Sequence, residues 1–176
     1  MEKQISKKRC GWVVDALLKD YHDNEYGRLK TSDTSLFEKL CLESFQAGLS
    51  WRTVLVKREA FRSAFSDFNI EQCAKLTDEY LESLMSCEQI IRNRKKIFAV
   101  RENARAALRV IEEHGSFFQY IYSFKKPQAL LISLKRYGFV FIGPTIMEAF
   151  MQSIGILEAH EAGCFLHTPR TEMMEG

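Results

Sequence analysis

The sequence predicts an all-α protein built as one compact body of several short helices. Nearly every periodic segment repeats its apolar residues at helical spacing, and only 3 prolines interrupt 176 residues. The one strand-like stretch, 139–142, is too short to build a sheet. A chain of this length forms one domain, or at most two closely packed lobes. Residues 1–8 and 171–176 show no such pattern, so we expect both tails to be flexible.

Caps and breaks set the order of the helices. Asp33, Thr34 and Ser35 offer N-caps for a helix that is expected to end near Glu43, and Ser35 and Glu38 have the spacing of a capping box. Gly48 breaks the pattern, and Ser50 is a natural N-cap for the next helix. The helices that follow are expected over residues 51–65, 70–76, 78–85, 90–111, 117–124 and 128–136, and from residue 144 onward.

Composition and charge exclude several classes of protein. The formal net charge of +2 is too small to indicate a nucleic-acid partner unless the charge is clustered. No segment has the apolar length of a membrane span, and residues 1–9 lack the apolar core of a signal peptide, so we expect an intracellular protein without membrane contact. The 5 cysteines are odd in number and scattered, which argues against a disulfide framework. Packing roles are expected for Cys41, Cys73 and Cys87.

Basic residues gather between residues 90 and 109. This stretch contains one acid, Glu102, and seven basic residues, namely Arg92, Arg94, Lys95, Lys96, Arg101, Arg105 and Arg109. The last three fall on one helical stripe, and the others crowd its N-terminal end. Backbone amides at a helix start together with nearby cations form a phosphate site. The alternative is an ordinary solvated helix face.

An acid and a large aromatic residue flank the break at Gly48. Glu43 lies near the end of one helix, Trp51 lies in the first turn of the next, and the apolar Leu49 lies in the turn between them. If the two helices fold back on each other, the carboxylate and the indole line one pocket. That pair suits a flat, electron-poor ring, through stacking, cation–π attraction and hydrogen bonding. The alternative is a surface acid and a core tryptophan.

Four residues have side chains and spacing that suit a metal ion. His160 and Cys164 are one helical turn apart, so both can face one point. Cys10 and His22 form a second pair near the other end of the chain. Together they would make a tetrahedral Cys2His2 site, although unrelated thiols and imidazoles remain an alternative and His167 is a rival ligand.

Six motifs occur in an order that resembles one family. They are Arg9-Cys10-Gly11-Trp12; Tyr21-His22-Asp23-Asn24-Glu25-Tyr26-Gly27; Leu42-Glu43 with Gln46-Ala47-Gly48-Leu49-Ser50-Trp51; Ile90-Ile91-Arg92-Asn93-Arg94 with Lys96-Ile97; Gly138-Phe139 with Phe141-Ile142-Gly143-Pro144-Thr145; and His160 with Gly163-Cys164. The chain resembles the bacterial DNA-3-methyladenine glycosylase I family, the Tag-type branch of the helix-hairpin-helix glycosylases. The resemblance covers about residues 9–166.

The resemblance implies a compact, two-lobed, all-helical body with a helix-hairpin-helix element and a lesion pocket between the lobes. A zinc staple would join the chain ends, with one structural Zn²⁺ per chain. The ligands implied for this ion are Cys10, His22, His160 and Cys164.

The resemblance also implies the roles of the site residues. Glu43 would be the carboxylate that hydrogen-bonds the flipped base. The other implied base-binding residues are the stacking walls Tyr21 and Trp51, together with Trp12 and Gln46. Leu49 would plug the gap left in the duplex. The hairpin from Glu88 to Arg94 would hold a phosphate, and the other implied DNA-binding residues are Gln89, Arg92, Arg94 and Lys96.

The implied activity is hydrolytic excision of 3-methyladenine from alkylated double-stranded DNA. No lysine stands out as a Schiff-base nucleophile, so we expect a monofunctional hydrolase without strand cleavage. We expect a monomer in the bacterial cytoplasm, associated with the nucleoid.

Departures from the family pattern leave an alternative open. Gln89 stands where the hairpin commonly has glycine, with Glu88 before it, and the loop after Phe124 is shortened. Tyrosine replaces the usual tryptophan at Tyr26 and at Tyr122. These changes are compatible with a protein of the same fold that binds DNA or lesions but cleaves weakly or not at all.

Overall fold

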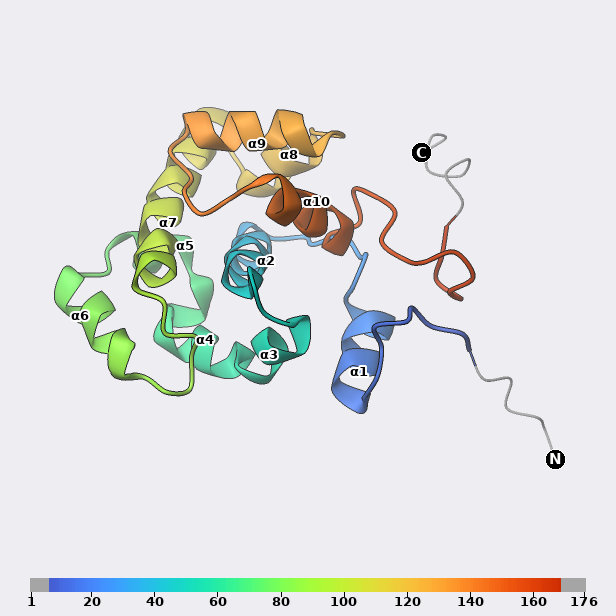
Figure 1. The fold of residues 1–176 in the computed structure, drawn as a ribbon. Coiled ribbons are helices and arrows are strands. Elements are labelled where there is room, and N and C mark those ends of the chain that lie inside the picture. Colours follow the sequence, from blue (N-terminus) through green and yellow to red (C-terminus); the bar gives the residue numbers. More distant parts are fainter. Residues whose placement is uncertain (1–6, 169–176) are drawn as a thin grey trace. The chain divides into compact units, whose positions relative to one another are not determined.

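A computed structural model describes residues 7–168 of the chain (Figure 1). Every regular element in this part is a helix, which confirms the all-α class. The elements are α1 (Ala16–Asn24), α2 (Asp33–Gln46), α3 (Trp51–Val56), α4 (Arg58–Ala64), η1 (Ser66–Phe68), α5 (Ile70–Ala74), α6 (Asp78–Ser83), η2 (Leu84–Ser86), α7 (Arg94–His114), α8 (Phe117–Tyr122), α9 (Pro127–Arg136) and α10 (Pro144–Ser153). None of these helices combines the length and apolarity needed to cross a bilayer. The predicted tails lie outside the described residues, apart from residues 7 and 8.

The chain forms two compact units. Unit 2 is continuous and spans residues 30–150. Unit 1 is discontinuous, because its described residues, 7–29 and 151–168, come from both ends of the chain. Within unit 2, the long helix α7 packs against α2, α5, α6 and α8.

Helix α2 is the most deeply buried element of unit 2. Each of its residues from Leu36 to Phe45 is buried, including four polar or charged ones. Phe45 packs its ring 4.4 Å from that of Phe61 and 6.1 Å from that of Phe65. The helix starts at the N-cap Ser32, whose side chain accepts a hydrogen bond from the Ser35 amide, so the predicted capping box is wrong.

Glu38 has a different partner from the one its spacing suggested. Its Oε1 accepts hydrogen bonds from Arg58 Nε at 2.7 Å and from Arg62 Nε at 2.9 Å. The carboxylate is 9% exposed, so this pairing fixes α4 against α2 through a largely desolvated contact.

The remaining helix boundaries follow local caps. Ser50 caps α3 as predicted, accepting a hydrogen bond from the Thr53 amide, but Lys57 divides the predicted 51–65 helix into α3 and α4. The predicted 90–111 helix begins only at Arg94, because Asn93 caps it through the Lys96 amide. It continues to His114, and Gly115 ends it in the left-handed conformation.

Two glycines allow the separate pieces of unit 1 to meet. The Gly27 amide donates to the Ser153 carbonyl at 3.0 Å, and both Gly27 and Gly155 have positive φ. A Cβ at Gly155 would lie 2.7 Å from the Gly27 carbonyl oxygen, and one at Gly27 would lie 2.8 Å from Ala159 Cβ. The backbones approach so closely that larger residues at these positions would push them apart.

Candidate functional site

A cavity of about 460 Å³ opens in unit 2 beside the end of α2. Two segments line it, one running from α2 into the turn before α3 and one forming the start of α10. Its lining residues are Glu43, Gln46, Ala47, Gly48, Leu49, Gly143, Pro144, Thr145, Ile146 and Ala149. The volume falls within the range of about 300–1,000 Å³ that is typical of small-molecule sites.

Glu43 is the only acid among the residues that line this cavity. Glu43 is 5% exposed, and its Oε1 lies 2.9 Å from Nζ of Lys39, which is one helical turn earlier on α2. The predicted surface alternative for Glu43 is therefore wrong, because the carboxylate is buried and ion-paired.

Trp51 is connected to Glu43 through the same lysine. Lys39 Nζ lies 3.6 Å from the centroid of the Trp51 ring, which is a close cation–π contact. The sequence reasoning missed Lys39, whose side chain is 1% exposed. Its sequence signal is the i, i+4 spacing to Glu43 on one helix, which pairs the two charges but does not show that the lysine is buried.

The turn between α2 and α3 presents an apolar side chain to solvent. Leu49 is 42% exposed, and its amide donates to the Gln46 carbonyl at 2.6 Å. Gly48 adopts a φ of +83° with open space around it, so the turn itself requires glycine. Lys96 Nζ donates to the carbonyls of Phe45 at 3.1 Å and Ala47 at 3.0 Å, which fixes the end of α2.

Unit 1 contains its own aromatic cluster. The Trp12 ring lies 6.2 Å from Tyr21 and 5.2 Å from Tyr26, and Tyr21 is 5% exposed. Of the predicted base-binding residues, Glu43, Gln46 and Trp51 therefore belong to unit 2, whereas Trp12 and Tyr21 belong to unit 1.

An ordered turn precedes α7. Gln89 and Arg92 are exposed, and the carbonyls of Glu88 and Gln89 accept hydrogen bonds from Lys57 Nζ at 3.0 and 3.2 Å. Arg94 pairs with Glu82 of α6.

The arginine stripe that follows is used largely within the fold. Arg101 donates to the Leu76 carbonyl, Arg105 to the Ala74 carbonyl and Arg109 to the Tyr137 carbonyl. These contacts tie α7 to the segments beside it.

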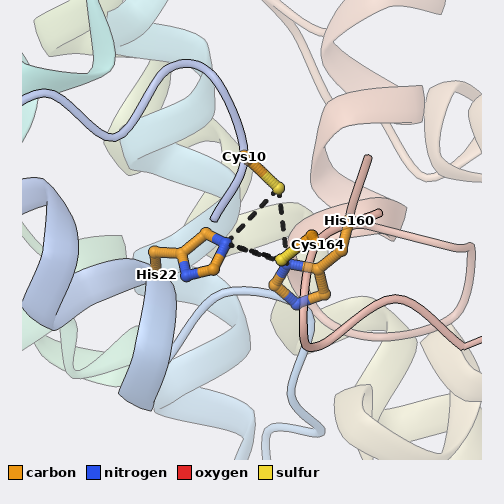
Figure 2. Close-up of side chains that lie close together, drawn as sticks. All are labelled: Cys10, His22, His160 and Cys164. Carbon is orange, nitrogen blue, oxygen red and sulfur yellow. Dashed lines mark hydrogen bonds between the residues drawn. The ribbon is translucent and has the colours of Figure 1, made fainter. Parts of the chain in front are cut away.

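Four side chains of unit 1 bring their ligand atoms together (Figure 2). His22 Nε2 lies 3.3 Å from Cys10 Sγ, 3.4 Å from Cys164 Sγ and 3.2 Å from His160 Nδ1. His160 Nδ1 lies 3.7 Å from Cys10 Sγ and 3.9 Å from Cys164 Sγ. This cluster could hold a metal ion. His167 lies outside it, because its Nδ1 lies 3.0 Å from the His160 carbonyl oxygen.

A second layer of contacts orients the cluster. His22 Nδ1 lies 2.8 Å from Asp23 Oδ1, and Arg9 binds the same carboxylate through Nε and a second nitrogen. The Arg9 hydrogen bond lowers the pKa of Asp23 to about 2, so this carboxylate is ionised. Because it accepts a hydrogen bond from Nδ1 of His22, it orients the ring so that Nε2 faces the cluster. Burial raises the pKa of the Cys10 thiol to about 11.

Comparison with known proteins finds one consistent family. The family model for methyladenine glycosylases matches residues 12–132 and 125–167. DNA-3-methyladenine glycosylase 1 of Escherichia coli (strain K12) is 41% identical over 178 residues, covering 89% of this chain and 95% of that protein. The DNA-3-methyladenine glycosylase of Haemophilus influenzae is 40% identical over 177 residues, covering 89% of this chain and 96% of that protein.

Solved structures agree with the sequence comparison. A crystal structure of 3-methyladenine DNA glycosylase I superposes with a TM-score of 0.86 at 40% identity, covering 92% of this chain and 100% of that one. The Staphylococcus aureus enzyme superposes with a TM-score of 0.84 at 32% identity, covering 89% and 94%. A tyrosine-to-phenylalanine variant in complex with 3-methyladenine gives a TM-score of 0.84 at 30% identity, covering 91% and 99%.

Proposed function

The chain belongs to the methyladenine glycosylase family, and from that premise we propose how its own residues carry out the reaction. The protein is an N-glycosyl hydrolase that excises 3-methyladenine from alkylated DNA in base excision repair. The observation that carries the site assignment is the buried Glu43 carboxylate in the wall of a cavity large enough for a base.

The chemistry of the lesion explains why this inventory of residues is sufficient. An adenine methylated at N3 carries a positive charge, so its bond to the sugar is already weakened. Water attacks the sugar carbon, the carbon–nitrogen bond breaks, and its electron pair neutralises the departing base while the water loses a proton. The products are free 3-methyladenine and an abasic site. The enzyme must therefore select and position the base more than it must activate it.

We assign recognition of the flipped base to Glu43 and Trp51. The carboxylate accepts hydrogen bonds from the base, and the indole supplies a stacking face. Gln46 lines the same cavity and is the second polar side chain at that end of α2. Trp12 and Tyr21 of unit 1 remain proposed base-binding residues on the strength of the family resemblance alone.

DNA is bound by two exposed turns in this proposal. Leu49 fills the space that the flipped base leaves in the duplex, because an apolar side chain exposed on a turn beside the cavity suits that role. The segment from Glu88 to Arg94 is the hairpin that holds a backbone phosphate in this proposal, with the exposed Gln89 and Arg92 on it. Its position between η2 and α7 supports a helix-hairpin-helix element.

We propose a monofunctional reaction without strand cleavage. The lysine beside the pocket acid, Lys39, is 1% exposed and paired with Glu43, so its amine is not presented to the sugar. Borohydride treatment during turnover should therefore trap no covalent protein–DNA adduct. A trapped adduct would show a Schiff-base route.

We propose that the Cys2His2 cluster binds one structural zinc ion. A tetrahedral zinc, with Zn–S bonds of about 2.3 Å and Zn–N bonds of about 2.0–2.1 Å, holds its donors about 3.3–3.8 Å apart. The five distances given above, 3.2–3.9 Å, lie within about 0.1 Å of that range, and all four ligand atoms lie within 4.8 Å of one another. Zinc here would stabilise unit 1, since all four ligands come from the protein.

Elemental analysis tests the zinc proposal. One equivalent of zinc is expected in protein purified without chelator, and Cys164→Ser should lower both zinc content and thermal stability. Cys73→Ser is the matched control, because Cys73 is a buried cysteine of unit 2 and should leave zinc content unchanged. Metal-free protein of full stability would refute the proposal.

Base release from alkylated duplex DNA tests the site. We expect Glu43→Gln to lower the single-turnover rate by about 10²-fold or more while the protein stays folded. Glu71→Gln, an exposed acid on α5, is the matched control and should retain the wild-type rate. Equal rates for both variants would remove Glu43 from the site. DNA binding without any base release by the wild type would instead favour a non-cleaving protein of the same fold.

We also propose that the enzyme acts as a monomer on DNA in the bacterial cytoplasm, at the nucleoid. Sedimentation of the free protein, with one species at the mass of a single chain, checks the monomer.

A further inference from the structure

Lys39 already contacts two of the groups that the proposed function assigns to the damaged base. Its side chain is 1% exposed, and its Nζ lies 2.9 Å from Glu43 Oε1 and 3.6 Å from the centroid of the Trp51 ring. Lys39 and Glu43 are one turn apart on the buried helix α2, so the backbone itself holds them together. In the free protein a cation therefore engages both the anion and the aromatic face.

This pairing changes what the pocket can recognise. A lone buried carboxylate strongly prefers a positively charged ligand to a neutral one, because desolvation makes its field strong. With Lys39 in place, the carboxylate and the ammonium together carry no net charge. A cationic base then either meets the repulsion of Lys39 or displaces it, which exchanges one cation for another. In both cases the positive charge of the ligand brings little gain.

We propose that Lys39 is a specificity-determining residue that lowers the pocket's preference for positively charged purines. The pocket thereby distinguishes purines more by their shape and hydrogen-bonding groups than by their charge. This inference rests on the proposed function, since it requires the base to bind at Glu43 and Trp51.

A pair of probes with fixed charge isolates the effect. The 3,9-dimethyladeninium ion carries a permanent positive charge, whereas 9-methyladenine is neutral and has nearly the same shape. Their dissociation constants are measured by tryptophan fluorescence for the wild type and for Lys39→Met. We expect the variant to bind the cation about tenfold more tightly or better, with a much smaller change for the neutral probe. Lys39→Arg keeps the charge and should keep the wild-type ratio, and the exposed Lys75→Met is the matched control.

Stability provides a readout that moves in the opposite direction. Lys39→Met leaves the Glu43 carboxylate buried without its cation, so the variant should unfold at a lower temperature than the wild type. Binding of the cationic probe should restore more of the variant's stability than of the wild type's. A purely structural lysine would lower stability and affinity together.

The wild type alone supplies an independent measurement in case the variant does not fold. Lys39 Nζ lies over the Trp51 ring, so the NMR signal of the neighbouring ε-methylene protons should be shifted upfield. The cationic probe should shift this signal, and the neutral probe should do so much less. An unchanged signal on saturation with the cation, or a cation-to-neutral affinity ratio that Lys39→Met leaves unaltered, would overturn the inference. Binding of neither probe to the wild type would also overturn the inference, whereas failure of the proposed function would show as no base release from alkylated duplex DNA.

Discussion

Lys96 is predicted to stabilise the fold and not to contact a phosphate, although the sequence placed it among the DNA-binding residues. Its ammonium donates to the Phe45 and Ala47 carbonyls at 3.1 and 3.0 Å, at the end of α2. Burial lowers its pKa, which agrees with a partly desolvated ammonium. The substitution Lys96→Met keeps most of the aliphatic stem and removes both hydrogen bonds.

The expected magnitude follows from those two contacts. A hydrogen bond from a charged donor contributes about 1.5–3 kcal/mol when buried, and a cation at a helix C-terminus adds about 0.3–1 kcal/mol. Because Lys96 is only partly buried, we expect Lys96→Met to lower the free energy of unfolding by about 1–3 kcal/mol in total. For a chain of this size, that corresponds to a decrease in Tm of about 2–12 °C.

Urea unfolding and the salt dependence of DNA binding separate the two roles of Lys96. Lys96→Met should lower stability and leave the slope of log K against log salt unchanged. Arg92→Met, which removes an exposed cation on the hairpin, should leave stability unchanged and reduce the slope by about 0.9 for one lost phosphate contact. A Lys96→Met variant with full stability and a reduced slope would refute the reasoning.

Three further predictions concern the supporting structure. Asn103→Ala should destabilise the protein by about 2–4 kcal/mol in urea unfolding. The buried Asn103 side chain accepts a hydrogen bond from the Val140 amide at 2.8 Å and donates one to the Val140 carbonyl at 3.1 Å, and a loss below about 0.5 kcal/mol would contradict this reasoning. Glu38→Gln should cost about 2–4 kcal/mol by the same assay, since it leaves two arginines without their shared carboxylate; an unchanged midpoint would show that the cluster contributes nothing. Burial raises the pKa of Cys73 to about 12, so mass spectrometry should show that this thiol resists alkylation at pH 8.5. In unfolding experiments its contribution to stability should be complete below about pH 9 and should fall at higher pH. Rapid labelling of Cys73 in the folded state would refute this prediction.

Local sequence signals predicted the helices better than their boundaries. Ser50 was identified as a cap because serine before an apolar helix has few other uses. Ser35 was wrongly identified because Ser32, three residues earlier, competes for the same role and captures the Ser35 amide. The predicted 90–111 helix starts four residues too early in the sequence, because the apolar period extends through Ile90. The Asn93 side chain, which caps the helix, sets its actual start at Arg94.

The site shows the same limit. The Cys2His2 cluster was visible as two spaced pairs, but only the fold brings residues 10 and 164 together. Lys39 could not be identified from its position alone, because a lysine is ordinarily exposed and its burial depends on the helices that cover α2. The stripe of Arg101, Arg105 and Arg109 suggested phosphate binding. Instead these side chains donate to backbone carbonyls of neighbouring segments, and the sequence does not show which carbonyls lie beside a helix.

The discontinuity of unit 1 has a consequence for biosynthesis. Residues 30–150 leave the ribosome as an uninterrupted segment and can begin to fold while translation continues. The thiol and imidazole near residues 10 and 22 must wait until residues 160 and 164 have been synthesised before their site is complete. The proposed zinc ion can therefore be bound by all four ligands only after the C-terminal part of unit 1 has been made, and a chain that ends before residue 160 lacks two of them.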